Sequence, residues 1–142
     1  MKKLMQKLKD KKGFTLIEMI IVIAIIAILI ALIAPNLQKF IGSSKKTKVN
    51  ASAKTLYTAA STYCVDKYTE GASVGTVTWL EGESTDFSGL PSTTEDFPAE
   101  FLDDYFNRDE IPSGAKYAVV ITDGEVTKVY WNEDNISVTY PK

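Results

Sequence analysis

Hydrophobic residues are concentrated at one place in this chain, between Phe14 and Ala34. Only Thr15 and Glu18 interrupt that run. A helix of this length, rising about 1.5 Å per residue, just crosses a hydrocarbon core of about 30 Å. The pattern therefore predicts a membrane-spanning helix that carries one carboxylate close to its start.

Glu18 is unusual because it places a carboxylate within this apolar segment. An ionisable side chain at the centre of a bilayer costs about 2.5–3.5 kcal/mol by insertion scales, so it indicates a function and needs a partner. One interpretation is a helix cap, because free N–H groups and the helix dipole favour an acid in the first turn. A second is a charge pair with a group outside its own helix. The residues alone leave both interpretations open.

The residues before the apolar run indicate how the predicted membrane helix is oriented. Lys2, Lys3, Lys7, Lys9, Lys11 and Lys12 stand there against the single acid Asp10. This positive-inside bias predicts a cytoplasmic N-terminus and an outward-facing remainder. A secretory signal instead has an apolar core of about 7–15 residues and an Ala-x-Ala-like cleavage site, and this segment has no such site at its end.

Residues 36–71 keep a helical pattern but become amphipathic. A bend is expected at Pro35, whose ring removes an N–H and clashes with the preceding turn. An apolar stripe at helical spacing predicts packing against a domain, and it consists of Val49, Ala53, Leu56, Ala60 and Tyr63. The polar face carries Lys39, Lys45, Lys46, Lys48 and Lys54. We interpret these lysines as a solvated face, with docking to acidic surfaces of neighbouring molecules as the alternative.

From Ala72 onward the pattern changes from helix to strand, and Gly71 is the expected helix stop. Strands are predicted at Val74–Leu80, Lys116–Thr122, Glu125–Trp131 and Ile136–Tyr140, with Asp123-Gly124 as a type I′ hairpin signal. Glu81–Pro98 is expected to be an acidic loop. The aromatic segment Ala99–Asn107 is either a short helix or a loop pinned to the core. These elements predict an α+β fold in which the second half of the long helix covers a small antiparallel β-meander.

Composition narrows the possible functions. The chain has no histidine, which removes the usual general base and any Ser–His or Cys–His pair, and its one cysteine, Cys64, lies near the apolar stripe. We therefore expect no enzymatic activity, and we expect Cys64 to act as a small apolar residue.

The charge of the chain argues against nucleic acid as a partner. The formal charge is −2, but removing residues 1–13, with six lysines and one aspartate, leaves 10 basic and 17 acidic residues, or −7. Twelve acids against Lys67 and Arg108 lie between Asp66 and Glu110. Such a strip is poorly suited to binding phosphates.

The stretch Lys11-Lys12-Gly13-Phe14-Thr15-Leu16-Ile17-Glu18 resembles the class III signal of type IV pilins and the related pseudopilins. The resemblance implies that a membrane-embedded peptidase cuts after Gly13 and that the new N-terminus, Phe14, is N-methylated. It implies that Glu18, fifth in the mature chain, neutralises the Phe14 amine of a neighbouring subunit. Pro35 matches the helix-kinking proline of the family, whereas Ala27 stands where the family often has a glycine.

The same resemblance implies the organisation and the partners of the chain. Residues 1–13 are the leader, 14–35 the membrane and filament-core helix, 36–71 the amphipathic half and 72–142 the globular domain. The expected function is a structural subunit of an extracellular pilus that serves adhesion, twitching motility or secretion, without a cofactor. Its expected partners are copies of itself, other pilins, the prepilin peptidase and methyltransferase, and a membrane assembly platform. The alternatives are a pseudopilin of a secretion or DNA-uptake machine and a permanently anchored binding domain.

A metal site is not expected, and the alternative is a calcium site built from acidic side chains. Some secretion pseudopilins that this chain resembles bind calcium in the corresponding region, and carboxylates are calcium ligands. The candidate ligands are Asp123, Glu125, Glu133 and Asp134. Their spacing matches no calcium-binding loop.

Overall fold

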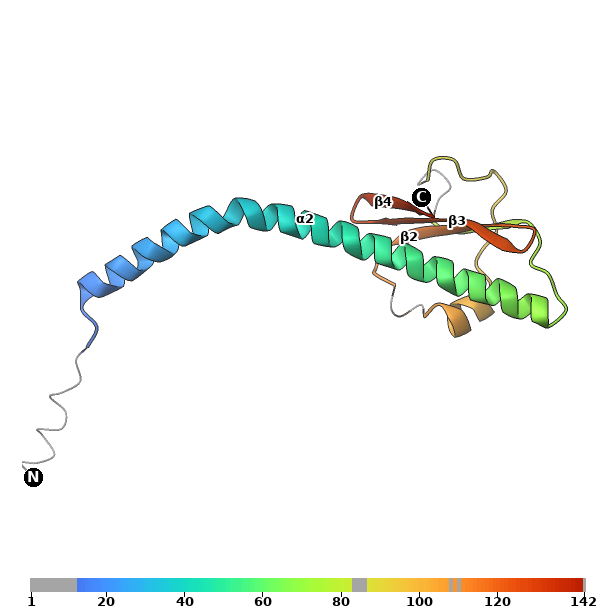
Figure 1. Cartoon of the computed structure of the whole chain (residues 1–142), viewed down its shortest axis with the longest axis horizontal. Coiled ribbons are helices and arrows are strands. Elements are labelled where there is room, and N and C mark those ends of the chain that lie inside the picture. The colour runs from blue at the N-terminus through green and yellow to red at the C-terminus, as the bar shows by residue number, and fades with distance from the viewer. Residues whose placement is uncertain (1–12, 83–86, 108, 110, 142) are drawn as a thin grey trace, which may run out of the picture. The chain divides into compact units, whose positions relative to one another are not determined.

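The computed structural model describes residues 13–82, 87–107, 109 and 111–141 (Figure 1). Except for Gly13, the predicted leader thus lies outside the described residues, as does part of the acidic loop. The chain divides into two units, residues 1–42 and 43–142, with the division inside a helix. Each unit is described by itself.

One long helix, α2, runs from Leu16 to Thr69 and belongs to both units. The helix continues through Pro35 without interruption. The bend expected at Pro35 stays a prediction. The end of α2 is a Schellman motif, in which Gly71 has a φ of 82°. The N–H of Ala72 donates to the carbonyl of Lys67 at 2.9 Å, and the N–H of Gly71 donates to that of Tyr68 at 3.1 Å. The stop predicted at Gly71 is confirmed.

Residues 43–142 contain a four-stranded antiparallel sheet in the order β1-β2-β3-β4. The strands are β1 (Val77–Glu81), β2 (Lys116–Thr122), β3 (Glu125–Glu133) and β4 (Ile136–Tyr140). The predicted meander and the α+β class are confirmed, and β2 and β4 have the predicted bounds.

Strand β1 differs from the predicted Val74–Leu80 at both ends, and β3 differs from its prediction at one end. Strand β1 starts at Val77 and not at Val74, because Gly75 has a φ of 68° and cannot continue an extended chain. Strand β3 extends past Trp131 to Glu133. The turn after it needs only Asp134 and Asn135, both with positive φ (54° and 62°), as in a type I′ hairpin.

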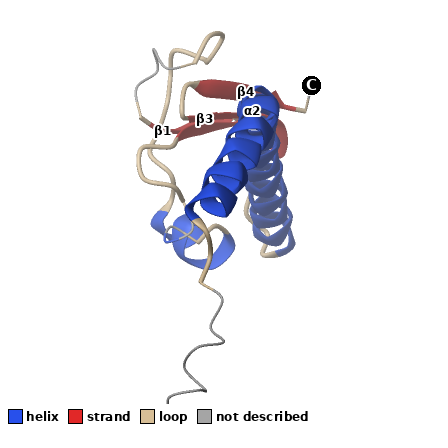
Figure 2. Cartoon of the chain, turned by 90° about the vertical axis from the view of Figure 1, so that its left-hand side faces the viewer, coloured by secondary structure: helices blue, strands red, loops and turns tan. Residues whose placement is uncertain are grey.

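The second half of α2 lies against one face of the sheet (Figure 2). All five residues of the predicted apolar stripe are buried there. The largest fully buried side chains of the protein are Trp131, Phe101, Leu56, Ile121, Val49, Val119 and Val129. Hydrophobic burial between the helix and the sheet therefore holds this unit together.

The short helix expected within Ala99–Asn107 is present: residues 99 and 100 are α-helical and continue directly into a π-helical turn, η2 (Phe101–Tyr105). The N–H of Phe106 donates to the carbonyl of Phe101 at 3.0 Å, a bond that spans five residues and leaves both rings buried. Phe101 stacks on Phe97 with ring centroids 5.6 Å apart and contacts Trp79 at 5.4 Å. The alternative of a loop at this position is wrong, although the aromatic side chains do hold the segment against the core.

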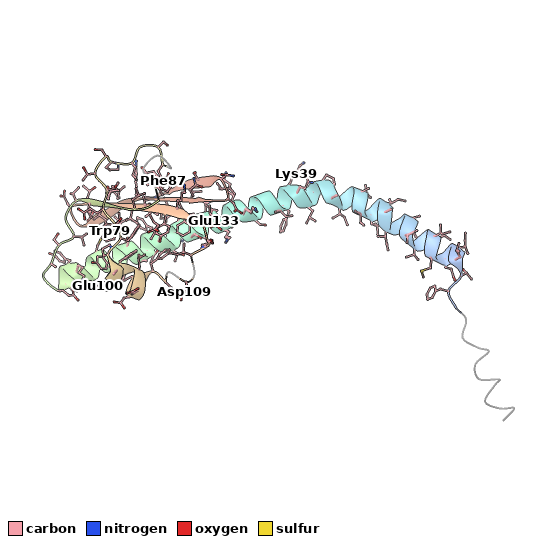
Figure 3. All side chains as sticks on the ribbon, turned by 180° about the vertical axis from the view of Figure 1, so that it is seen from behind. Lys39, Trp79, Phe87, Glu100, Asp109 and Glu133 are labelled. Carbon is pink, nitrogen blue, oxygen red and sulfur yellow. The ribbon has the colours of Figure 1, made fainter. Side chains whose placement is uncertain are left out.

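The opposite face of the sheet is also covered in part. Phe87 packs there on Ala118 and Tyr130, and the hydroxyl of Tyr130 donates to the carbonyl of Gly89 (Figure 3). This cover explains why Tyr117, Ala118 and Val119 are buried in succession, although a strand turns alternate side chains to opposite faces.

Hydrogen bonds to carboxylates fasten the end of α2 to η2 and to the segment before it. The ammonium of Lys67 donates to Glu100 at 2.7 Å and to Glu70 at 3.1 Å, and the hydroxyl of Tyr105 donates to Asp66 at 2.9 Å. The bonds to Glu100 and then Glu70 raise the pKa of Lys67, and the bond to Asp66 raises the pKa of Tyr105.

These shifts predict a loss of stability in alkali. Because the folded chain holds both protons more tightly than the unfolded chain, their contribution is complete below about pH 10 and declines as the pH rises through the folded pKa values. Near-UV circular dichroism should show the unfolding temperature falling as the pH rises above about pH 10. Lys67→Met should flatten that fall, and an unchanged slope would contradict this assignment.

Candidate processing and assembly site

A capping box forms the start of α2. Thr15 precedes the first helical residue, Leu16, and Glu18 is the third residue of the helix. The N–H of Thr15 donates to Glu18 Oε2 at 2.8 Å, and the Thr15 hydroxyl donates to the same oxygen at 2.7 Å. The N–H of Glu18 donates back to the Thr15 hydroxyl at 3.3 Å. Each residue thus satisfies an N–H group of the other.

The capping box leaves half of the carboxylate unused. Both bonds from Thr15 end on Oε2, and within the described chain Oε1 of Glu18 accepts no hydrogen bond. The cap interpretation of Glu18 is therefore confirmed for the uncut chain. It does not exclude an outside partner, because Oε1 remains available to a donor from another molecule.

The apolar segment after Glu18 has no cover in the isolated chain. Every residue from Gly13 to Lys48 is exposed, including Phe14 at 78%. Among the described residues, α2 is the one helix long and apolar enough to cross a membrane, and none of its most apolar window is buried. A contiguous apolar surface of this extent marks a site of membrane or protein contact.

The four acids considered as metal ligands do not meet, so the alternative metal site is wrong. Asp123 and Glu125 stand at the start of β3, and Glu133 and Asp134 at its end. At about 3.3 Å per residue, a strand of this length separates the two pairs by more than 20 Å. No group of three or more metal-binding side chains occurs in the described part of the chain.

Two of these acids instead fasten the sheet to α2. Lys48 donates to Glu133 Oε1, and the indole N–H of Trp131 donates to Glu133 Oε2 at 3.2 Å. Lys45 donates to Asp134 at 2.8 Å in a pair that is open to solvent. The pairing with Lys45 lowers the pKa of Asp134 and raises that of Lys45.

Removal of the two acids should have unequal effects on stability. Glu133→Ala leaves the buried indole N–H of Trp131 without its acceptor and should cost about 1–3 kcal/mol. Asp134→Asn removes only an exposed pair while tolerating the left-handed backbone, and should cost at most about 1 kcal/mol. Urea unfolding of the full chain in detergent micelles, followed by tryptophan fluorescence, measures both. Equal losses would show that Glu133 does not act through its buried contact.

The remaining lysines of the predicted polar face are free. Lys39, Lys46 and Lys54 are exposed and make no ion pair with the described residues. Lys45 and Lys48 form the ion pairs with Asp134 and Glu133 just described, and no local pattern in the sequence predicts these pairs. Cys64 is buried in the core, and burial raises the pKa of its thiol, which disfavours the nucleophilic thiolate.

Sequence reasoning missed Thr15 as a partner of Glu18. The signal was present, because a threonine three residues before a glutamate at the start of an apolar run is the capping-box pattern. The expected roles of the other site residues stay predictions, and the structure gives only their positions. Gly13 and Phe14 immediately precede the capping box, and Pro35 lies within α2.

A known family model matches the part of the chain that contains this site. The model of the prokaryotic N-terminal methylation motif matches residues 8–34, which include Gly13, Phe14 and Glu18. The matched segment thus joins the capping box to nearly all of the apolar run.

Several curated relatives are similar over part of their length. The type IV major fimbrial protein FimA of Dichelobacter nodosus is 36% identical over 91 residues, which is 63% of this chain and 55% of the relative. The type IV major pilin protein PilA of Myxococcus xanthus is 46% identical over 56 residues, 39% of this chain and 26% of the relative. The type IV major alpha-pilin of Moraxella bovis is 51% identical over 53 residues, 35% of this chain and 33% of the relative. The chain thus spans about a quarter to just over half of the length of these relatives. No solved structure matches it.

The long apolar helix, its capped start and the methylation motif define a protein with a type IV pilin-like N-terminus and a pilin-like α+β fold. With the relatives just described, they make the N-terminal part of this chain similar to type IV pilins.

Proposed function

We propose that this chain is the precursor of a structural subunit of an extracellular type IV pilus and not an enzyme. The observation that carries the proposal is Glu18, an acid with one unused carboxylate oxygen at the start of the exposed apolar part of α2, inside the methylation motif. The names of the relatives, all pilins or fimbrial proteins, favour a pilus over the pseudopilus alternative.

The proposed processing converts the membrane helix into a filament helix. A prepilin peptidase cuts between Gly13 and Phe14, and a methyltransferase modifies the Phe14 amine. Before assembly, the apolar segment 14–35 spans the membrane with the lysine-rich N-terminus in the cytoplasm and the globular domain outside. A membrane assembly platform then passes the subunit into the filament, where copies of this chain and other pilins cover its exposed apolar surface.

The proposed role of Glu18 follows from the geometry of its carboxylate. Oε2 is used by Thr15, and Oε1 accepts the charged Phe14 amine of a neighbouring subunit. An α-amino group is mostly cationic at neutral pH, so the two charges compensate in an apolar surrounding. Pairing offsets part of the cost of removing each charge from water.

Intact-mass analysis of filaments sheared from cells tests this proposal. We expect a chain that has lost residues 1–13 and gained one methyl group on Phe14. A permanently anchored binding domain would keep the leader and would be absent from the sheared fraction. A pseudopilin would be cut and methylated but would give no surface filaments at native expression.

A further inference from the structure

Outside residues 14–35, large apolar side chains are exposed at two places on α2 among the described residues. The first, which we call the proximal patch, consists of Leu37, Phe40 and Ile41, exposed at 51%, 68% and 48%. The second consists of Val65 and Tyr68, exposed at 60% and 78%. In each place the spacing of three or four residues puts the side chains on one side of the helix.

Val65 and Tyr68 form a wall of a groove. A hollow of about 340 Å³ lies between the end of α2 and the turn from β2 to β3, and it is lined by Cys64, Val65, Tyr68, Ser73, Val74, Asp123, Gly124 and Glu125. A second hollow of about 190 Å³ shares Cys64, Val65, Gly124 and Glu125 with the first and extends it along the helix. We call the two hollows together the distal groove.

The distal groove has an acidic rim. Asp123 and Glu125 are both exposed and line the hollow. The side chain of Asp123 is held by the hydroxyl of Thr76 at 3.3 Å, and Glu125 has no ion pair within the described chain. The groove therefore offers an apolar floor beside uncompensated negative charge.

The proximal patch has the opposite charge. Lys39 lies next to Phe40 in the chain, is exposed, and makes no ion pair with the described residues (Figure 3). Lys45, Lys48 and Lys67 already have acidic partners in their own chain. Lys39 thus places a cation, unpaired among the described residues, beside an exposed aromatic ring, and this arrangement complements an apolar groove with carboxylates at its edge.

We propose that the proximal patch of one copy of this chain docks into the distal groove of a neighbouring copy. Phe40 enters between Val65 and Tyr68, and Lys39 lies against Asp123 and Glu125. The inference rests on the proposed self-assembly and adds the residues of one lateral contact. The two surfaces differ and every copy carries both, so the contact is heterologous, and within the proposed filament it would repeat from one copy to the next.

Cysteine cross-linking within filaments tests this contact. The full chain is produced in its own cells with Cys64→Ala, to remove the native thiol, together with Phe40→Cys and Val65→Cys, both at exposed positions. A short bis-maleimide should join position 40 of one copy to position 65 of the next, giving a ladder beyond the dimer. Each single-cysteine variant should stop at the dimer. The matched control combines Phe40→Cys with Ser137→Cys, an exposed residue of β4, and should give no ladder.

The outcomes separate this inference from the proposed function. Filaments that form normally but give no species beyond the dimer would overturn the contact while leaving the pilus subunit in place. In filaments, protection of Phe40→Cys from a water-soluble maleimide without a ladder would place the patch against a surface other than the distal groove and would also overturn the contact. An absence of filaments from unaltered cells would instead count against the proposed function.

A charge exchange provides a second test of the same contact. In the cross-linking background, Lys39→Glu should reduce the ladder, because it places an acid against the acidic rim, and Glu125→Lys should reduce it for the converse reason. The two changes together should restore it. If both single variants lose the ladder and the double variant does not restore it, Lys39 and Glu125 do not face one another.

Discussion

Glu18→Gln should yield a chain that is cut after Gly13 and methylated at Phe14 but is absent from surface filaments. Glutamine serves in the third position of a capping box as glutamate does, so the start of α2 is preserved. What is lost is the negative charge that faces the Phe14 amine of a neighbour. Removing one member of a buried ion pair costs about 3–5 kcal/mol, because the other charge stays in an apolar surrounding. Mass analysis of membranes and electron microscopy of sheared material measure the two steps separately.

Thr15→Val is the matched control, because it removes the other half of the capping box. The hydroxyl of Thr15 both donates to Glu18 and accepts from its N–H. Loss of such a cap costs about 1 kcal/mol of helix stability, but the charge at Glu18 remains. We expect filaments from this variant. If Thr15→Val abolishes filaments as completely as Glu18→Gln does, Glu18 acts as a cap and the intersubunit pair is excluded.

The elements that sequence reasoning placed well depend on short-range patterns. The stripe from Val49 to Tyr63 recurs at helical spacing, and each of its residues is buried against the sheet. Gly71 ends α2 because only a residue that tolerates positive φ closes a Schellman motif without strain. Asp123-Gly124 connects β2 to β3 as a hairpin turn, with φ values of 53° and 82°.

Features that depend on contacts distant in sequence were not predictable. Lys48 and Glu133 are 85 positions apart, and only the docking of α2 on the sheet brings them together. Four acids near two turns therefore resembled a possible metal site, although a full-length strand separates them. The π-helical turn η2 likewise results from packing, because Phe101 and Phe106 both reach the core only if the turn between them is widened.

The proposed processing site could be placed from the sequence because its motif is local. Gly13, Phe14 and Glu18 lie within one short motif, and the same few residues supply the capping box. The sequence does not show which carboxylate oxygen of Glu18 accepts the two hydrogen bonds from Thr15. Only the structure shows that both bonds end on Oε2. The complementarity between the proximal patch and the distal groove also needed the fold, because the groove joins α2 to a turn more than 50 residues further along the chain.

Phe101→Ala should be the most destabilising single change in the globular unit. The ring is fully buried and meets Tyr63, Trp79, Phe97, Tyr105 and Phe106 within 6.4 Å of its centroid. Its truncation leaves a cavity where α2, η2 and β1 meet, and a buried Phe→Ala change costs about 3–5 kcal/mol. Because 1 kcal/mol shifts the midpoint of a domain this size by roughly 4–8 °C, unfolding should occur more than about 10 °C lower.

Near-UV circular dichroism of the full chain in detergent micelles measures this loss. All tryptophans and tyrosines lie between Tyr57 and Tyr140, so the signal reports the globular unit without a contribution from the apolar helix. Tyr68→Ala is the control, because this aromatic side chain is 78% exposed and its removal should change stability by no more than about 0.5 kcal/mol.

The same variant separates folding from processing. Gly13 and Phe14 belong to the other unit of the chain, so the peptidase should cut Phe101→Ala as it cuts the unaltered precursor. A destabilisation of this size raises the unfolded fraction that proteases remove, so the mature chain should be scarce and filaments few. Accumulation of uncut Phe101→Ala precursor would contradict this independence, because it would mean that the peptidase requires a folded globular unit.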